Sequence, residues 1–351
     1  MSRPPLDPAM SDSRNTADPC LIAVVVTYNR IAQLRKSLQH TLAEAFDHVL
    51  VVNNGSTDGT DGYLDQLAAS CARLEVIHRS INIGGAGGFH VGLSRLQVLY
   101  QLGDLPQHSW AVLYDDDSYP DLGCIECFRS ASSSRQGITG IAAAVFDDAG
   151  FVAEVNRPII NIFRFPRQLI SQVHSGSCHT IRDLYHVPSH QILQRGYCMS
   201  VDAISFVGLF LNLSELSKLL WPMPDIDLFL YGDDTLYTWG LRDRGATLIF
   251  DSDLRFIHET STGYREGVIM PVWKLFYITR NSWFVYRRLA GFLAGIFLFL
   301  IGTLSKAAIL ARYSDPSARR GALRAIFLGL SDLVRARKQR SLQSVRLFVE
   351  T

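Results

Sequence analysis

Three consecutive aspartates, Asp115, Asp116 and Asp117, are the clearest candidates for chemistry in this sequence. They follow an apolar run, WAVL, that is typical of a buried strand. Alternate side chains of an extended segment point the same way, so Asp115 and Asp117 can converge on one hard cation while Asp116 points elsewhere. A solvated acidic loop is the alternative interpretation. The position directly after a buried strand favours a divalent metal, which would relieve the repulsion among the three charges.

A second acidic pair, Asp233 and Asp234, stands at the predicted start of a helix. Either acid could simply cap that helix. The helix macrodipole favours ionised side chains there, so we expect at least one carboxylate able to accept a proton at neutral pH. Downstream, His258 follows a strand-like segment at 254–257. A lone histidine is more often structural, but beside two metal carboxylates it becomes a candidate third metal ligand.

Polar residues follow the first two predicted strands. Thr27 and Asn29 come after the first strand, and the loop NNGSTDGT, with Asn54 and Asp58, comes after the second. Asn, Ser and Asp favour turns and helix caps on their own account, which is the simplest interpretation of the second loop. The same side chains are suited to hydrogen bonding a nucleoside. Neither loop is specific by itself, and the nucleoside role is a hypothesis.

A glycine-rich segment, INIGGAGGF, contains Gly84 and Gly85 and is predicted to form a flexible loop before a helix. Glycines let backbone N–H groups approach a phosphate at a helix start. A dinucleotide-binding fingerprint would belong directly after the first strand, where this sequence has TYNR instead. The glycines therefore indicate close approach of the backbone to a ligand, with a tight turn as the alternative.

Alternating strands and helices must position these residues. Continuous apolar, β-branched runs that end in polar breaks are typical of parallel strands covered on both faces. The pattern predicts an α/β fold with a doubly wound, mostly parallel sheet, whose ligand lies at the C-terminal ends of the strands. Strands are predicted at 21–27, 48–53, 74–79, 110–114, 138–146 and 247–250, and helices at 31–43, 62–72, 213–220 and, without interruption, 272–312.

Composition narrows the class of protein. The chain has 351 residues, of which 48% are hydrophobic, and its formal net charge is +1. A sizeable core is therefore possible, and no global field would attract nucleic acid. The six cysteines are scattered without the paired spacing of a structural zinc site, so we expect reduced thiols, as in the cytosol.

Two segments bear on location. The first 20 residues lack the charged and apolar regions of a signal peptide, so we expect a disordered tail and a protein that stays where it is made. The apolar run at 289–304 is shorter than the roughly 20 residues that a membrane-spanning helix needs. We expect this run and the arginines after it to hold the chain at the inner face of the cell membrane, with a core or dimer helix pair as the alternative.

Five motifs, taken in order, resemble those of family 2 inverting glycosyltransferases with the GT-A fold: VVVTYNR, VVNNGSTDGT, NIGGAGGF, LYDDDSYP and FLYGDDTLY. The resemblance covers roughly residues 21–259. Within that family, the glycine loop and the triple acid are most similar to bacterial galactofuranosyltransferases, and rhamnosyltransferases of cell-wall and O-antigen synthesis come next. One departure is Gly232, where galactofuranosyltransferases often carry Trp, and it bears on acceptor contacts.

The resemblance also implies roles for individual residues. It makes Asp115, Asp117 and His258 ligands of Mn²⁺ or Mg²⁺, and Asp234 the general base with Asp233 beside it. The metal would stabilise the departing nucleoside diphosphate, and the base would remove the proton of the acceptor hydroxyl. The residues placed around the nucleotide are Thr27, Asn29, Asn54, Asp58, Gly84, Gly85 and Asp116.

The resulting prediction is transfer of galactofuranose from UDP-galactofuranose to a lipid-linked or growing surface polysaccharide. A rhamnosyltransferase that uses dTDP-rhamnose is the first alternative, and a metal-dependent nucleotidyltransferase the second. A membrane-docked scaffold with a decayed site is disfavoured, because clustered charge is costly to keep without a ligand. The predicted organisation is a tail at 1–20, a GT-A catalytic domain at 21–265 and a helical, membrane-associating region at 266–351.

Overall fold

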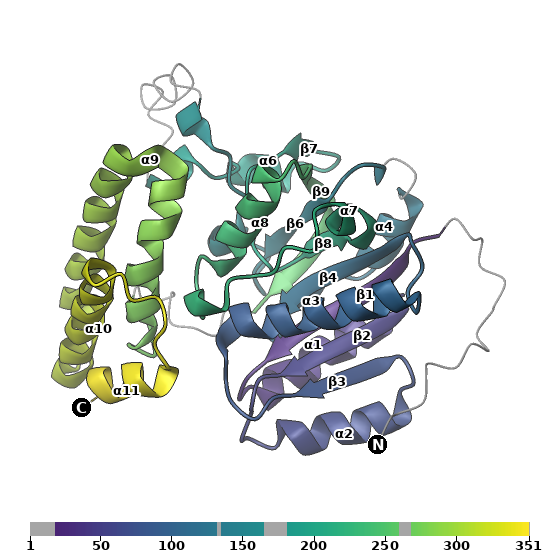
Figure 1. Cartoon of the computed structure of the whole chain (residues 1–351), viewed down its shortest axis with the longest axis horizontal. Coiled ribbons are helices and arrows are strands. Elements are labelled where there is room, and N and C mark those ends of the chain that lie inside the picture. Colours follow the sequence, from purple (N-terminus) through teal and green to yellow (C-terminus); the bar gives the residue numbers. More distant parts are fainter. Residues whose placement is uncertain (1–17, 132–134, 165–180, 260–267, 351) are drawn as a thin grey trace.

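The computed structural model describes residues 18–131, 135–164, 181–259 and 268–350, so nearly all of the predicted tail at 1–20 lies outside the described residues. At its centre is a mixed sheet with the strand order β3-β2-β1-β4-β8-β6-β9-β5, in which β7 also pairs with β9 (Figure 1). The strands are β1 (Cys20–Thr27), β2 (His48–Asn53), β3 (Leu74–His78), β4 (Ser109–Asp115), β5 (Ser118–Pro120), β6 (Gly140–Phe146), β7 (Cys198–Ser200), β8 (Leu209–Asn212) and β9 (Leu248–His258).

The N-terminal half of the sheet is parallel, as the alternation of strands and helices predicts. β1 pairs in parallel with both β2 and β4, and β2 pairs in parallel with β3. The connecting helices are α1 (Ile31–Ala43), α2 (Thr60–Ser70) and α3 (Gly84–Leu102). In register, Thr27 lies beside Asn53 and Val26 beside Asp115. The polar ends of β1, β2 and β4 therefore meet at one edge of the sheet.

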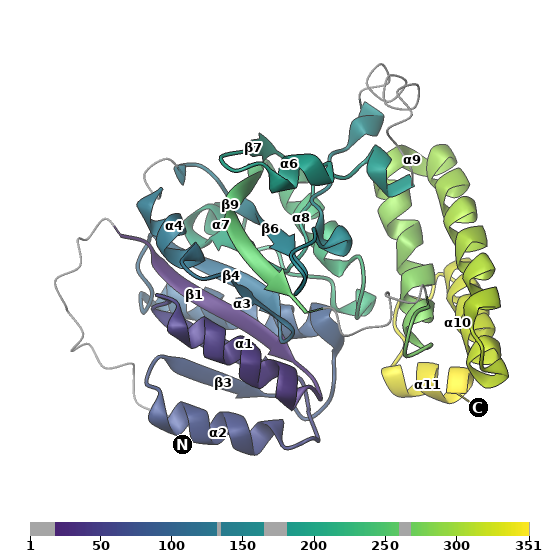
Figure 2. The ribbon, with the colours of Figure 1, turned by 180° about the vertical axis from the view of Figure 1, so that it is seen from behind.

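Helices cover both faces of this sheet, which confirms the doubly wound arrangement (Figures 1 and 2). Side chains of β1 alternate between two cores. Ile22 and Val24 pack in the core that includes residues of α3, whereas Ala23 and Val25 pack in the core that includes residues of α1 and α2. The second core also contains residues of α4 (Cys124–Ser130).

The second half of the sheet is mixed. β8 lies antiparallel between β4 and β6, and β6 pairs in parallel with β9. The segments 247–250 and 254–257, which look like two short pieces in the sequence, form the single strand β9. The register shifts between Ala143 and Ala144 of β6, where the partners on β9 jump from Asp251 to Arg255. Burial still alternates along β9, but the polar run at 251–253 separates two apolar pieces in the sequence, which explains why the sequence suggests two strands.

The C-terminal region is a group of helices beside the sheet domain: α9 (Lys274–Ile309), α10 (Pro316–Val334) and α11 (Leu342–Glu350) (Figure 1). The predicted uninterrupted helix at 272–312 is wrong in one respect, because Gly291 adopts φ 78° and ψ −170° and breaks it. The limb after Gly291 runs back along the first limb, with Gly295 against the backbone of Arg287 and Gly302 against Tyr286. Glycine is suited to both the reversal and this close packing.

The glycine-rich segment also differs from its prediction as a flexible loop. Gly84 is the first residue of α3, so the glycines form the start of the helix. A Cβ atom at Gly88 or Gly92 would collide with Val26 or Val24 of β1. These glycines therefore serve close packing of α3 on the sheet. The shorter helices in the second half are α6 (Ser189–Leu193), α7 (Leu213–Lys218) and α8 (Asp233–Asp243).

Candidate active site

A cavity of about 950 Å³ lies at the C-terminal ends of β1 and β4. Residues far apart in the sequence meet there, including the acidic triplet, the acidic pair, His258 and the first turns of α9. Of the predicted site residues, the structure places all but Asp58 in the lining: Thr27, Asn29, Asn54, Gly84, Gly85, Asp115, Asp116, Asp117, Asp233, Asp234 and His258.

The three aspartates of the triplet have different partners. Asp116 accepts hydrogen bonds from the Thr27 hydroxyl at 2.8 Å and from the Tyr28 amide at 3.3 Å, so it faces the end of β1. Asp117 faces His258, whose Nε2 atom is 3.4 Å from its Oδ1. Arg30 bridges the two, with an ion pair to Asp117 and a 3.3 Å contact to Asp116. Asp116 and Asp117 form the turn between β4 and β5, so the extended conformation predicted for the triplet ends at Asp115.

Burial and mutual repulsion give these three carboxyl groups different pKa values. Burial raises the pKa of Asp115 to about 7, with the charges of Asp117 and Asp116 acting in the same direction. Burial also raises the pKa of Asp116 to about 6 against the opposing charge of Arg30. At Asp117 burial acts upward too, but the hydrogen bond and charge of His258, together with Arg30, hold the pKa at about 2. Without a metal, Asp117 is thus the member of the triplet that stays ionised at neutral pH.

The predicted metal ligands are of residue types that bind divalent cations, although their side chains do not form a compact metal site in the structure. Within the described ranges, no three His, Cys, Asp or Glu side chains stand together as a metal site, and Arg30 occupies one oxygen of Asp117. The donor set nevertheless suits a hard cation. His258 Nδ1 lies 2.8 Å from the Asn156 side-chain oxygen and donates to it, so Nε2 is the nitrogen that faces Asp117 and that would have to lose its proton to bind a cation.

The acidic pair lies across the same cavity, at the N-terminus of α8. Burial raises the pKa of Asp233 well above its ordinary value, and the neighbouring charge of Asp234 adds to this. Burial also raises the pKa of Asp234, but backbone and side-chain hydrogen bonds from Thr235 act against it, and the Thr235 amide donates to Asp234 at 2.6 Å. Burial therefore raises the pKa of both acids despite the hydrogen bonds that they accept at the helix start. Asp234 is the better placed of the two to stay ionised.

The polar loops predicted beside a nucleotide are joined to one another by hydrogen bonds. Asn29 accepts from the Thr57 amide at 2.6 Å, which joins the loops after β1 and β2. Asn54 donates to the Gly84 carbonyl at 2.8 Å, which joins the second loop to the glycine turn. Asp58 is exposed and away from the cavity, where it accepts from the Ile31 amide and from Thr60. Its turn and capping role is therefore visible in the structure.

Three further side chains in the cavity lining are absent from the sequence-based set. Arg30 is the cation that balances the triplet, and Asn156 orients His258. Lys274, at the start of α9, lines the cavity, and among the described residues its ammonium group has no hydrogen-bond or ion-pair partner. Burial, with the charge of Arg30, lowers the pKa of Lys274 to about 8. An unpaired cation facing a group of carboxylates is suited to a phosphate-bearing ligand.

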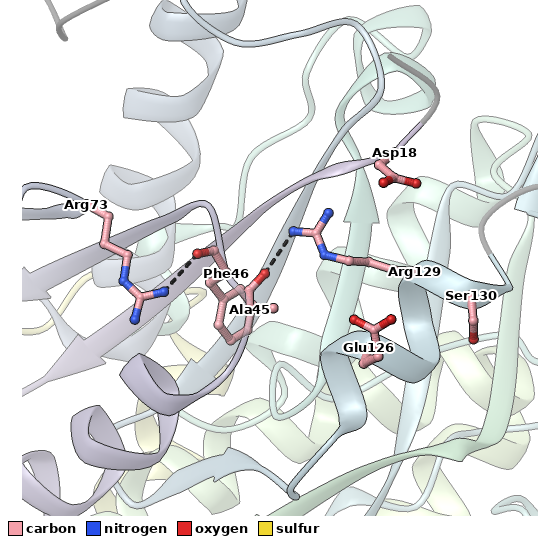
Figure 3. Close-up of a pocket in the computed structure, with 7 residues that line it drawn as sticks. All are labelled: Asp18, Ala45, Phe46, Arg73, Glu126, Arg129 and Ser130. Atoms are coloured by element: carbon pink, nitrogen blue, oxygen red, sulfur yellow. Dashed lines mark hydrogen bonds between the residues drawn. The ribbon is translucent and has the colours of Figure 1, made fainter. Parts of the chain in front are cut away.

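A second, smaller cavity of about 400 Å³ is formed by Asp18, Ala45, Phe46, Arg73, Glu126, Arg129 and Ser130 (Figure 3). It lies beside the N-terminal end of β1, away from the acidic triplet. Its two arginines are already engaged, because Arg73 donates to the Phe46 carbonyl at 3.0 Å and Arg129 donates to the Ala45 carbonyl at 2.8 Å. This cavity therefore offers no comparable set of reactive groups.

Comparisons with known proteins agree with this geometry. Residues 22–177 match glycosyl transferase family 2. The sequences of curated proteins give no match. Among solved structures, the chain is similar to GalNAc-T7 with UDP, GalNAc and Mn²⁺, at 10% identity and a TM-score of 0.52, over 94% of this chain and 56% of that one.

The chain is also similar to the mannosyltransferase PcManGT from Pyrobaculum calidifontis in complex with GDP-Man and Mn²⁺. The identity is 12%, the TM-score 0.52, and the match covers 90% of this chain and 87% of that one. Likenesses at these identities establish the fold, and they confirm the predicted GT-A architecture with a C-terminal helical region. The match over residues 22–177 supports a glycosyltransferase of family 2 for that part of the chain.

Proposed function

We propose that this chain is an inverting glycosyltransferase that takes its sugar from a nucleoside-diphosphate donor. The observation that carries the proposal is that one cavity is lined both by a metal-type donor set, Asp115, Asp117 and His258, and by a separate acidic pair on α8. Transfer at an anomeric carbon needs both functions, one for the leaving diphosphate and one for the attacking hydroxyl.

The two groups of side chains act on opposite sides of the anomeric carbon. Asp234 accepts the proton of the acceptor hydroxyl as that oxygen bonds to the anomeric carbon, while the bond from this carbon to the diphosphate breaks on the opposite face. A single displacement of this kind inverts the anomeric configuration. Asp115, Asp117 and His258 would hold Mn²⁺ or Mg²⁺, which when bound supplies charge stabilisation to the diphosphate. Thr27 fixes Asp116, and Asn54 fixes the turn at Gly84, beside the expected position of the nucleotide.

The proposed donor is UDP-galactofuranose, with dTDP-rhamnose second, and the proposed acceptor is a lipid-linked or surface glycan. Support for this choice comes from the glycine turn and the triple acid, which resemble that subgroup. Incubation with a panel of nucleotide sugars and Mn²⁺ should release nucleoside diphosphate. Selective turnover of dTDP-rhamnose would overturn the donor choice, whereas release of pyrophosphate would indicate a nucleotidyltransferase.

A matched pair of variants tests whether this cavity performs the reaction. Asp234→Asn changes the proposed base, and Asp243→Asn makes the same change at the other end of α8, outside the cavity lining. Only the first should strongly reduce the rate of diphosphate release. Equal loss in both variants would mean that the effect comes from the helix and not from the base.

We further propose that the C-terminal helices contact the membrane surface. One helix, Lys274–Arg312, is long and apolar enough to be a candidate span by composition, and only 11% of its most apolar window is buried. The reversal at Gly291 leaves a limb, 292–309, shorter than the roughly 20 residues that a span needs. Leu293 is 80% exposed and Phe297 65% exposed on this limb. These features favour contact with the surface over crossing of the bilayer.

The basic residues expected at anionic headgroups are not all available. The basic residues after the apolar run that we expect near headgroups are Arg312, Arg319, Arg320, Arg324, Arg335, Arg337, Lys338 and Arg340. Arg340 instead forms a two-pronged ion pair with Asp332, whose side chain is 0% exposed. Arg340 is therefore a structural residue, because its release would leave a buried carboxylate unpaired. The other arginines of the set are exposed.

Flotation with vesicles that contain anionic phospholipid tests the membrane proposal. The native chain should float with the vesicles at low salt, and Leu293→Glu with Phe297→Glu should prevent it. Leu122→Glu is the control, because Leu122 is a largely exposed apolar residue in the sheet domain. A chain that remains free of vesicles and self-associates through these helices would support the alternative of a dimer interface.

A further inference from the structure

The segment that leads into the acidic pair, residues 227–232, has an unusual backbone. Phe229, Tyr231 and Gly232 all have positive φ, at 64°, 65° and 78°. Side chains other than glycine rarely adopt this left-handed conformation, and it persists only where the surroundings fix it. The next residues are Asp233 and Asp234. The surroundings that fix this segment therefore also decide where the two carboxyl groups stand.

Asn281, on the first limb of α9, supplies most of that restraint. Its side-chain nitrogen, whose two hydrogens are shared among them, lies within hydrogen-bond distance of three carbonyl oxygens of the segment: that of Leu228 at 2.9 Å, that of Leu230 at 2.8 Å and that of Tyr231 at 2.9 Å. Asn281 is 1% exposed. The contact to Leu228 is buried and the other two are partly buried, so these carbonyls have few alternative partners and the contacts restrain the turn.

Arg280 in turn fixes the orientation of Asn281. Its Nε atom donates to the Asn281 side-chain oxygen at 2.9 Å, so the amide nitrogen must face the segment. The Arg280 guanidinium also donates to the carbonyls of Asp227 at 2.9 Å and Leu228 at 3.0 Å. Two neighbouring residues of one helix thus hold four carbonyl groups in the turn that precedes the acids.

The other side of the segment contacts the glycine turn. The Ala86 amide donates to the Phe229 carbonyl at 3.2 Å. A Cβ atom at Gly84 would fall inside van der Waals contact with that same carbonyl oxygen, so only glycine fits there. The segment is therefore held between α9 and the start of α3, where the donor is expected.

We propose that Asn281, oriented by Arg280, is a positioning residue that sets the place of Asp233 and Asp234 relative to the donor. This inference rests on the proposed function, because it assigns the acids to the transfer reaction. It extends the site into the C-terminal helical region, beyond residues 22–177. Misplacement of a catalytic group by about 1 Å costs roughly 100-fold in rate, so a modest relaxation of the turn should be measurable.

Asn281→Ala tests the proposal, with Lys306→Met as the matched control. Lys306 is buried in the same helical region and contacts Ser282 at 3.4 Å, but it does not touch the segment. We expect Asn281→Ala to lower kcat by about 10- to 100-fold and to change KM for the donor by less than about threefold. Lys306→Met should leave the kcat of the folded enzyme near the native value.

Amide hydrogen exchange gives a readout that does not need activity. In Asn281→Ala, exchange should accelerate at the amides of residues 228–234 and stay native in the sheet, whereas Lys306→Met should spare that segment. Native exchange there in Asn281→Ala would overturn the proposal, even if the native chain proved not to transfer sugar. If Asn281→Ala does not fold, Asn281→Ser, which retains one donor, should show a smaller acceleration in the same segment. Unchanged exchange in that variant would count equally against the proposal.

Discussion

The raised pKa of Asp115 predicts that metal binding weakens as the solution is acidified. A carboxyl group must lose its proton to bind a cation, so protons compete with Mn²⁺ at this residue. The pKa of Asp115 is about 7, whereas that of Asp117 is about 2. Over the neutral range Asp117 thus stays ionised, and Asp115 gains its proton as the pH falls through about 7. The affinity is fully present above this pKa and is lost below it.

The size of the effect follows from the same pKa. For one competing proton with a pKa of about 7, the apparent affinity should fall roughly 8-fold between about pH 7.5 and pH 6.0, and tenfold for each further unit. His258 adds to the slope, because burial lowers its pKa but the hydrogen bond and charge of Asp117 outweigh burial and raise it. An Asp115 with an ordinary carboxyl pKa would give almost no change over this range.

Electron paramagnetic resonance of free Mn²⁺, titrated with protein at constant ionic strength, measures this affinity without any substrate. Asp115→Asn should bind more weakly at about pH 7.5 and should lose the part of the slope that Asp115 contributes. Asp104→Asn, a change of an exposed aspartate outside the cavity lining, is the control. A native affinity that does not vary between about pH 6.0 and 7.5 would refute the reasoning, since Asp115 would then not titrate in that range as a ligand.

Three further outcomes are expected. Asp234→Asn should lower kcat by about 10²- to 10⁴-fold with donor affinity nearly unchanged, and a larger effect from Asp233→Asn would reverse their roles. Lys274→Met should weaken binding of nucleoside diphosphate in isothermal titration by about tenfold, because it removes a cation of the cavity lining that has no ion-pair partner among the described residues, and undiminished affinity would contradict this. Asn156→Ala should weaken Mn²⁺ binding about 10- to 100-fold by freeing His258 to turn, as outer-shell changes do, and native Mn²⁺ affinity would argue against this orienting role.

Local signals were sufficient for much of the fold and for the acidic groups. Helix 31–43 and strand 48–53 have the predicted bounds, because continuous apolar runs and helical spacing are short-range patterns. Asp115 and Asp117 could be singled out because their strand is unmistakably buried. The reversal at Gly291 escaped prediction, since one glycine within a long apolar run is compatible with an uninterrupted helix.

Contacts between distant parts of the chain account for most of what the sequence could not predict. Arg30 stands 86 and 87 residues before the aspartates it pairs with, and nothing in TYNR identifies it as their partner. Asn156 lies in a stretch without periodicity, and its role depends on the end of β9. The sequence suggests that Gly84 binds a phosphate. In the structure, glycine is required there because the Phe229 carbonyl leaves no room for a Cβ atom.

The hold of α9 on the turn at 227–232 bears on how such enzymes can be re-engineered. An exchange of the C-terminal region between two homologues at the predicted boundary, 265/266, would join an unfamiliar helix to a turn that depends on Asn281 and Arg280. In the chimera, α9 and the turn would not be complementary, so Asp233 and Asp234 should lose their positions. A chimera in which the turn and α9 come from the same homologue keeps those contacts. The segment to be exchanged should therefore begin before Asp227, inside the predicted catalytic domain.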